Sequence, residues 1–574
     1  MEQPSQLPKV SAKQLSGYSI KNDSTQARLV VWTFLLTPSI MAQCAQTSIS
    51  SDFDNLPVEI LRAVCSQLSN ADIKSLRLTS RYLRDISHLN LDRVFISANP
   101  RNIEVLLAIA NHDVFRHCVR EIIWDDAVLK DVANKDNDGP SGYSSGESES
   151  EDNAADGDEE IMSRDLTYLC KDTVDTSEGR LKALDKSYHS DNKQHRQLDN
   201  LMRSRDSLAY WNLLLKQQET VLRSGADETA FRYAVQRFPR LNKVTVTPAT
   251  HGFLFTPLYQ TPMIRAFPPG FVYPLPRGWP SDENSALDDS DGFPEGWENE
   301  EERKQWRGVG IVSNVLADFA ETLQISELSL DSHKLPTGID YTFFKRPNTD
   351  YDNLCKIVEQ PGFKSITLSL ITAYISDREP EDFDFYRNGR ISGLLARASD
   401  LESFVYQTDY SHNPGAADEE DIFVSLLDIF PSDMWSTGRL KHFGLRGILV
   451  TQDDLVSFLA QLPSTLRSVE LSFLAMVDGN DYAGLLRDIR DKLDWRHRPK
   501  SQRIQVTISV TSPNVPHHGR YINLDREVRE YIYGDGPSPF HVIEGIDESF
   551  VPFGTGIVLD EFDTSFRKPY IGYG

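Results

Sequence analysis

The stretch Leu440-Lys-His-Phe443-Gly-Leu445 returns in outline 26 residues later as Leu466-Arg-Ser-Val469-Glu-Leu471. In both stretches the first, fourth and sixth residues are apolar, and the alternation at the end is typical of a short β-strand. Five further stretches follow this pattern, the last one loosely: Leu241-Val244-Val246, Ile325-Leu328-Leu330, Phe363-Ile366-Leu368, Leu401-Phe404-Tyr406 and Ile504-Val506-Ile508. Helix-like spacing comes after the strands, as at 455–462, so the pattern indicates a repeated strand-and-helix unit.

The unit between Leu440 and Leu466 has the length of a leucine-rich repeat, and the longer units require insertions. The asparagine that normally forms a ladder in such repeats is missing, so we expect degenerate repeats. The predicted fold class is mixed α/β, with N-terminal helices, a helical segment and a degenerate leucine-rich-repeat-like solenoid. A plain α/β domain with unrelated strands is the alternative.

The length of 574 residues and the 39% hydrophobic content indicate two or three domains. The net charge of −25 is concentrated in two segments, because 131–160 and 281–302 each carry a net charge of −10 and leave −5 for the rest. The first of these is poor in large apolar residues and should be disordered. The predicted organisation is a poorly ordered extension (1–50), a helical block (51–93), a connecting helix and strand region (94–133), an acidic linker (134–160), a helical segment (161–240), the repeat domain (241–520, with a Pro-rich and acidic insert at 250–305) and a tail packed on the repeats (521–574).

Composition also limits the partners and the compartment. A body with net negative charge is unsuited to nucleic acid, whose phosphates require a basic face. The five cysteines are far apart, which favours a reducing intracellular compartment, cytoplasm or nucleus. The apolar run 29–36 imitates a signal peptide, but it is too short to span a membrane. Translation from Met41 would remove it, and a secreted or membrane-tethered protein is a third alternative.

The block at 53–83 reads Phe53-Asp-Asn-Leu56-Pro57-Val58-Glu59-Ile60-Leu61, then Arg-Ala-Val64-Cys-Ser-Gln-Leu68-Ser69-Asn-Ala-Asp72-Ile73 and Lys-Ser-Leu76-Arg77-Leu78-Thr-Ser80-Arg81-Tyr82-Leu83. Pro57 suits the start of a helix with an apolar stripe, and Ser69 with Asp72 forms a capping box that opens a second helix. Two short helices of this kind carry more apolar side chains than they can bury alone.

This block resembles the F-box, since Leu56-Pro57, Glu59, Leu61, Leu68, Asp72, Leu76 and Ser80-Arg81-Tyr82 are in register with its pattern and only Thr79 departs from it. The segment from Leu440 to Trp495 and the tail are similar to fungal F-box proteins with unassigned substrates. The resemblance implies binding to a Skp-type adaptor and, through it, to a cullin. The implied adaptor-binding residues are Leu56, Pro57, Ile60, Leu61, Leu68, Ile73, Leu76 and Tyr82, and we expect them to be partly exposed without the partner.

The resemblance therefore implies a substrate-recognition subunit of an SCF-type ubiquitin ligase, which itself catalyses nothing and needs no cofactor. A scaffold or regulatory protein that holds the adaptor without ubiquitination is the alternative. The unknown target protein is expected on the inner face of the repeats, at Thr245, Ser329, Thr367, Val405 and Gly444, or on the loop with Pro268 and Trp279. Phosphorylation is expected at three serines among acidic residues, Ser145, Ser148 and Ser150.

Three apparent enzyme motifs lack the context that their chemistry requires. Gly142-Tyr-Ser144-Ser-Gly146 spells a nucleophile elbow inside an acidic tract that has no strand and helix around it. Gly308-Val-Gly310 lacks the third glycine of a dinucleotide site. His517 and His518 have no cysteine or carboxylate partners for a metal, so no catalytic or metal site is predicted.

Overall fold

The computed structural model describes residues 56–130, 170–171, 173–180, 197–280, 303–335, 337–372, 383–409, 423–431, 438–477, 480–511, 519–542 and 549–571. The chain divides into two compact units, Met1–Leu91 and Asp92–Gly574, and each is described by itself. A search of the described residues found no helix with the length and apolar character needed to cross a membrane.

The described part of the first unit contains the helices α3 (Val58–Cys65), α4 (Asn70–Arg77) and α5 (Arg81–Ile86). The first two correspond to the predicted pair. Arg81 and Tyr82 do not extend the second helix but begin a third, because the Ser80 side chain accepts a hydrogen bond from the backbone N–H of Leu83 and caps a new helix.

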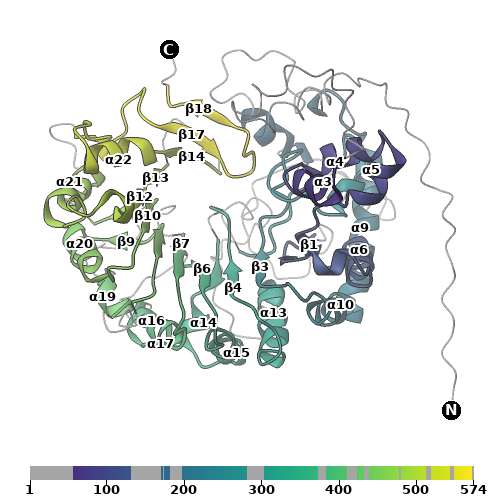
Figure 1. The fold of residues 1–574 in the computed structure, drawn as a ribbon, viewed down its shortest axis with the longest axis horizontal. Helices are drawn as coiled ribbons and strands as arrows, with labels where there is room; N and C mark the ends of the chain where they lie inside the picture. Colours follow the sequence, from purple (N-terminus) through teal and green to yellow (C-terminus); the bar gives the residue numbers. More distant parts are fainter. Residues whose placement is uncertain are drawn as a thin grey trace, which may run out of the picture. The chain divides into compact units, whose positions relative to one another are not determined.

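A parallel sheet forms the centre of the second unit (Figure 1), and its strands lie side by side in chain order. They are β1 (Arg93–Ile96), β2 (Glu121–Asp125), β3 (Lys243–Thr247), β4 (Glu327–Leu330), β6 (Ser365–Ile371), β7 (Ser403–Thr408), β8 (His442–Arg446), β10 (Ser468–Ser472) and β12 (Gln505–Thr507). The short β5 (Ile339–Asp340) pairs with β6, and β9 (Leu449–Val450) pairs with β11 (Ala475–Met476).

The repeated apolar pattern of the sequence sets the register of this sheet. All seven predicted strands are present, and the second apolar residue of each pattern lies opposite its equivalent on the next strand, in the series Val244, Leu328, Ile366, Phe404, Phe443, Val469 and Val506. These side chains are buried in one continuous core. The strand prediction is therefore confirmed, and the sheet is parallel.

The sheet begins earlier than the sequence pattern indicated. Strands β1 and β2 belong to it, although 94–133 was predicted as a connecting region. Strand β2 has three large apolar residues in a row, Ile122, Ile123 and Trp124, so its sequence does not alternate between apolar and polar as the later strands do. This is why the pattern at 241 marked the first repeat.

Helices cover one face of the sheet, on the outer side of the strands in Figure 1. They are α6 (Pro100–Ala110), α10 (Ala226–Val235), α13 (Arg307–Asp318), α14 (Thr342–Lys345), α15 (Thr349–Val358), α16 (Asp384–Arg387), α17 (Arg390–Arg397), α19 (Leu426–Ile429), α20 (Gln452–Gln461) and α21 (Tyr482–Lys492). Short 3-10 helices occur at Phe115–His117, Ile264–Ala266, Lys304–Trp306 and Lys500–Gln502.

Hydroxyl and carboxylate side chains connect neighbouring strands at their carboxyl ends, where the asparagine ladder is missing. Ser369 Oγ accepts from the Ser332 N–H at 3.2 Å, and Ser472 Oγ accepts from the Ser509 N–H at 3.1 Å. Thr408 Oγ1 donates to the Gly447 carbonyl at 2.6 Å. These bonds satisfy buried backbone groups that follow the strands.

The segment 249–280 packs against α9 (Ser204–Ser224) through an aromatic cluster. Asp126, just after β2, accepts hydrogen bonds from the Trp124 and Trp279 indoles at 3.2 and 2.8 Å and from the Gly308 backbone N–H at 2.8 Å. This buried carboxylate joins the strand, the Pro-rich segment and the start of α13. Gly308 is required there, because a Cβ atom would lie 2.3 Å from the Trp124 indole nitrogen.

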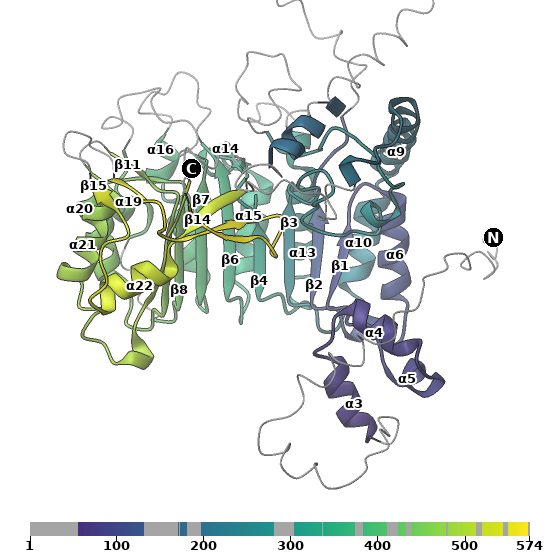
Figure 2. The ribbon, with the colours of Figure 1, turned by 90° about the horizontal axis from the view of Figure 1, so that it is seen from above.

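The C-terminal part contains an antiparallel sheet, β13 (Ser509–Val510), β14 (Arg520–Asn523), β17 (Ile557–Asp560) and β18 (Arg567–Pro569), and helix α22 (Asp525–Tyr533). A second small pair is β15 (His541–Val542) with β16 (Ser549–Phe550). Figure 2 shows β14 and the strands near it in front of the parallel sheet, on the face opposite the helices. The tail thus forms a sheet of its own.

Candidate functional site

The helices of the first unit are held by local polar contacts. Ser69 caps α4 as predicted, since its Oγ accepts from the Asp72 N–H at 3.2 Å and donates to the Asp72 carboxylate at 2.7 Å. Asn90 donates from its side chain to the carbonyls of Cys65 and Leu68 at 3.2 and 3.0 Å. Asn70 closes the arrangement by exchanging hydrogen bonds with the Asn90 backbone. These contacts tie the end of α3 and the start of α4 to the segment that leaves the unit.

The eight predicted adaptor-binding residues fall into two groups by burial. Six are at least partly exposed: Leu56, Pro57, Ile60, Leu68, Leu76 and Tyr82. The exposure expected for Leu61 and Ile73 is wrong, since both side chains are 0% exposed. They lie on the buried sides of two short amphipathic helices, where they form part of the interior of the unit.

One exposed apolar residue was missed as a site residue. Leu78 follows α4 and is 88% exposed, more than Ile60 at 50% or Tyr82 at 41%. Helix α4 ends at Arg77, so Leu78 lies just beyond the helix and not on its buried face. Large apolar side chains left in solvent on so small a unit are typical of a protein-binding surface.

The charge of the helices differs from that of the whole chain. Residues 56–91 contain five lysines and arginines and three acids, a net charge of +2 within a chain of −25. Arg81 and Arg84 are exposed on α5, the helix that also carries Tyr82, and Arg84 pairs with Asp85 at 3.2 Å. This combination favours an apolar partner surface bordered by acidic groups.

The predicted target-binding residues on the parallel sheet are mostly inaccessible. Thr245, Ser329, Val405 and Gly444 are buried, and only Thr367 is partly exposed, so the expectation that they line an open face is wrong. Thr245 donates to Glu121 at 2.9 Å, and a Cβ atom on Gly444 would lie 3.2 Å from the Val405 side chain. Trp279 is also buried, whereas Pro268 is partly exposed.

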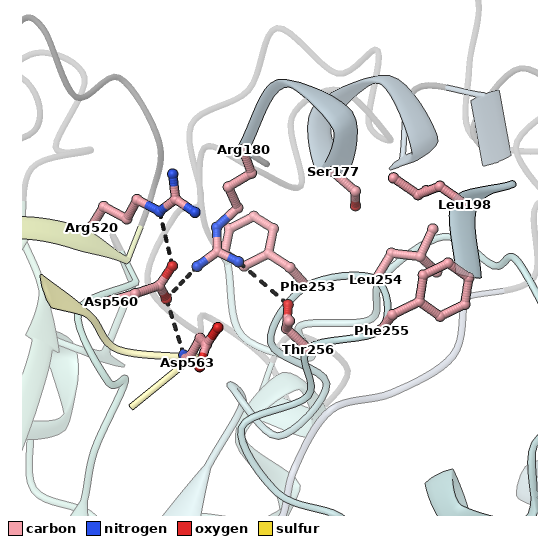
Figure 3. A pocket seen from close by; sticks show the side chains of 10 residues that line it. All are labelled: Ser177, Arg180, Leu198, Phe253, Leu254, Phe255, Thr256, Arg520, Asp560 and Asp563. Atoms are coloured by element: carbon pink, nitrogen blue, oxygen red, sulfur yellow. Dashed lines mark hydrogen bonds and ion pairs between the residues drawn. The ribbon is translucent and has the colours of Figure 1, made fainter. Parts of the chain in front are cut away.

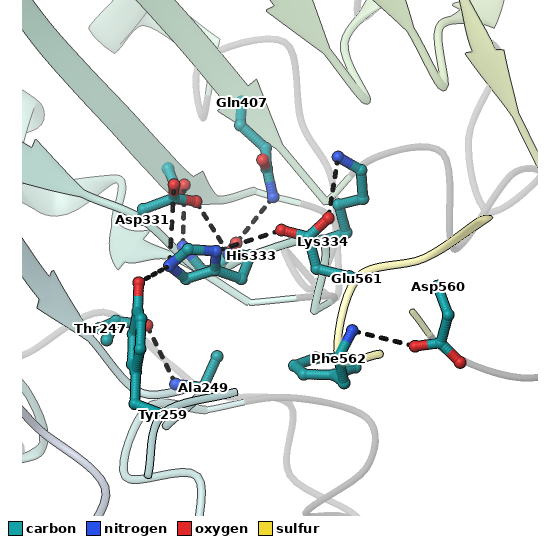
Figure 4. Close-up of polar contacts among 12 residues, drawn as sticks. Thr247, Ala249, Tyr259, Asp331, His333, Lys334, Gln407, Asp560, Glu561 and Phe562 are labelled. Atoms are coloured by element: carbon teal, nitrogen blue, oxygen red, sulfur yellow. Dashed lines mark hydrogen bonds and ion pairs between the residues drawn. The ribbon is translucent and has the colours of Figure 1, made fainter. Parts of the chain in front are cut away.

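Charged residues near the carboxyl end of β4 bind the C-terminal segment (Figure 4). His333 Nδ1 lies 3.2 Å from one Glu561 oxygen, and Lys334 Nζ lies 3.3 Å from the other. The opposite ring nitrogen of His333 is 3.3 Å from the Tyr259 hydroxyl. His333 and Lys334 both have left-handed backbone conformations, with φ of 51° and 66°, a strained turn that these contacts maintain.

The electrostatics of this cluster favour the charged forms. Burial lowers the pKa of His333, but Asp331 and Glu561 outweigh it and raise the pKa above its usual value. Burial raises the pKa of Glu561, yet Lys334 and His333 lower it to about 2. The cluster is a partly buried ion-pair network that fixes the tail, and its residues supply no activated nucleophile.

Among the described residues, the structure does not place the apparent enzyme motifs beside groups that their chemistry would require. Gly308 and Gly310 lie in α13, where Gly308 serves close packing against Trp124. Among the described residues no group of three or more His, Cys, Asp or Glu side chains could hold a metal ion. Ser144, the predicted phosphorylation sites Ser145, Ser148 and Ser150, and the pair His517–His518 lie outside the described residues.

Comparison with known families identifies the helices of the first unit. Residues 53–93 match the F-box-like family, so the chain contains an F-box-like domain at the position that the sequence predicted. F-box domains usually bind Skp-type adaptors. A comparison with curated proteins found no match. The chain thus contains an F-box-like domain, which suggests a protein-interaction role, and the match is confined to residues 53–93.

Proposed function

We propose that this protein is a substrate-recognition subunit of an SCF-type cullin ubiquitin ligase. The F-box-like match at 53–93 carries the proposal, because its helices expose Ile60, Leu78 and Tyr82 to solvent. The adaptor would cover these apolar side chains, and its acidic groups would complement the positive charge around them. The adaptor would connect the chain to a cullin, and ubiquitin transfer would take place on other subunits.

In this proposal the second unit binds the target protein. We interpret its parallel sheet as a degenerate leucine-rich-repeat solenoid, because seven strands repeat one apolar pattern in register and helices cover a single face. Side-chain bonds such as Ser369 to Ser332 and Ser472 to Ser509 would take over the role of the missing asparagines. The protein itself would catalyse nothing and would need no cofactor.

The decisive experiment replaces Leu56 and Pro57 with Ala in the full chain and measures co-purification of adaptor and cullin. Both residues precede α3, and Pro57 is exposed, so the change should leave the second unit folded. We expect loss of adaptor and cullin together, because truncation of central anchors typically costs a few kcal/mol of binding. Leu213→Ala, an exposed apolar residue of α9, is the control.

Three outcomes are distinguishable. Undiminished adaptor capture by the double variant would remove the proposal. Capture of the adaptor without a cullin by the wild type would favour a scaffold that does not ubiquitinate. A target that both forms capture while the proteasome is inhibited, but that only the wild type ubiquitinates, would support the ligase function.

A further inference from the structure

An exposed serine lies in a basic turn between α21 and β12 of the second unit (Figure 1). The sequence there reads Arg496-His-Arg498-Pro-Lys-Ser501, so Ser501 has arginines three and five residues before it. No other serine or threonine of the chain has arginines at both positions. Protein kinases that select arginine at these positions bind the guanidinium groups through acidic side chains beside their active site. The sequence around Ser501 therefore has the charge pattern that such kinases select.

The fold leaves the Ser501 hydroxyl accessible. Ser501 is exposed in the 3-10 helix Lys500–Gln502, which has no buried residue. Its hydroxyl makes no hydrogen bond within the part of the chain that the structure describes. Ser80 and Ser87 also follow an arginine by three residues, but Ser80 caps α5 and Ser87 is buried. Of these three serines, Ser501 is the one that combines the arginine with an exposed and unbonded hydroxyl.

The turn that carries Ser501 can open without disturbing the core. Trp495 and Ile504 are buried and fix its two ends. Between them, the Gln502 N–H donates to the Pro499 carbonyl at 2.7 Å and closes the 3-10 helix. A kinase binds its acceptor segment in an extended form, so this bond has to break. The cost is small, because water replaces the lost partner of an exposed backbone group.

The charged groups around the turn leave both arginines available. Arg498 forms no ion pair with a carboxylate of the described residues. Arg496 Nη2 lies 3.9 Å from Asp535, whose side chain is fully exposed. The nearby Asp494 is bound by His497, with 2.7 Å between its Oδ1 and the ring Nδ1. A long contact at the surface contributes little, so the carboxylates of a kinase can compete for both guanidinium groups.

The surroundings of Ser501 would also accept a phosphate group. Lys500 and Arg503 form no ion pair with a described carboxylate, and residues 495–505 contain four arginines and lysines and no acid. A phosphate adds about −1.5 to −2 charges, so the turn would keep a net positive charge of about +2. The new group would face cations and not other acids, and it would leave the fold intact.

We propose that Ser501 is a phosphorylation site for an arginine-directed protein kinase, with ATP as the phosphoryl donor. The Ser501 Oγ forms a bond to the γ-phosphorus of ATP, the bond from that phosphorus to the bridging β–γ oxygen breaks, and ADP leaves. The hydroxyl proton passes to the catalytic carboxylate of the kinase. The modification would place a negative group in a wholly basic turn, independently of adaptor binding by the F-box-like domain.

The test treats the folded full chain with ATP and protein kinase B, an arginine-directed kinase, and maps the phosphate by mass spectrometry. We expect phosphorylation of Ser501 in the wild type and none at this position in Ser501→Ala. A synthetic peptide of residues 494–505 gives the rate for a fully accessible site. The folded chain should react within about tenfold of this peptide, because opening the turn breaks one exposed hydrogen bond.

Two matched comparisons distinguish selection by the kinase from non-specific transfer. Arg498→Gln should lower kcat/KM for phosphorylation at least about 30-fold, because it removes a charge-assisted contact with the kinase. Arg467→Gln removes an equal charge beside the turn, where the Arg467 carbonyl accepts the Gln505 N–H at 2.8 Å, and should leave the rate unchanged. The exposed Ser464, which has no arginine before it at either position, should stay unmodified.

The proposal has clear contrary results. No phosphate on Ser501, or phosphorylation of the peptide but not of the folded chain, would overturn it. Equal rates for the two arginine variants, or equal modification of Ser464, would show that the kinase does not select this turn and would overturn it as well.

Discussion

Removing the exposed apolar side chains of the F-box-like helices should separate binding from folding. Ile60, Leu78 and Tyr82 are 50%, 88% and 41% exposed, which together amount to nearly two complete side chains. Burial of one large apolar side chain contributes about 1.5–3 kcal/mol. Because alanine keeps the first carbon, we expect the triple alanine variant to lose about 2–3 kcal/mol of adaptor binding, roughly 30- to 150-fold in Kd.

The same variant should unfold almost like the wild type. Substitutions of exposed side chains usually change the free energy of unfolding by less than about 0.5 kcal/mol each. Leu61→Ala provides the contrast, because this 0% exposed side chain should cost about 2–5 kcal/mol of stability. Binding is measured by surface plasmon resonance with purified adaptor, and folding by urea denaturation followed with circular dichroism.

A matched triple variant controls for the loss of exposed apolar surface in general. Val114, Leu201 and Leu213 of the second unit are 40%, 38% and 48% exposed. Their replacement by alanine should leave adaptor affinity unchanged. The assignment of the binding surface would be refuted if this control weakened adaptor binding as much as the F-box-like variant, or if the F-box-like variant bound normally.

Two further predictions concern the second unit. Gly308→Ala should destabilise it by about 1–3 kcal/mol, because the new Cβ would lie 2.3 Å from the Trp124 indole and 2.5 Å from Asp126 Oδ1. Gly310→Ala is the control and should be neutral or slightly stabilising, since the nearest neighbour of its new Cβ is 3.7 Å away. Equal urea midpoints for the two variants would contradict this prediction. Burial raises the pKa of Asp125 from 3.8 to about 7, so the stability that this group contributes at low pH is lost as the pH rises through 7. Asp125→Asn should therefore raise the free energy of unfolding at pH 8 by up to about 4 kcal/mol, with less benefit at pH 4. If denaturation curves gave a stability difference between variant and wild type that is independent of pH, the group would not be buried in this way.

The sequence predicted those parts of the fold in which a short pattern reports burial directly. The apolar residues at Val244, Leu328 and Ile366 marked strands and also their register, because equivalent positions on parallel strands face the same core. The Ser69 cap was also predictable from a short pattern, because Ser69 and its partner Asp72 are only three residues apart. Strand β2 carried no such alternation, so the region 94–133 was predicted to contain strand but not to belong to the repeated series.

The candidate site was predicted only in part, because exposure depends on packing between elements. Periodicity could not distinguish Leu61, which is buried, from Ile60, which is exposed, since the two are neighbours on one short helix. It also could not predict that Arg180 and Asp560, 380 residues apart, would form a buried ion pair (Figure 3). Contacts at that separation leave no local signal in a single sequence.

These long-range contacts restrict where a target protein could bind the second unit. The consecutive residues Asp560, Glu561 and Phe562 reach Arg180, His333 and Phe253 respectively. Breaking the buried ion pairs of Asp560 would leave buried charges without a partner, at a cost of about 3–5 kcal/mol in free energy. The loss of the other contacts would add to this cost. A target that used this part of the inner face would have to displace the segment against that free energy. We therefore expect the target to bind surfaces that the C-terminal segment leaves open, and alanine scanning of the partly exposed residues near Pro268 is the first place to look for them.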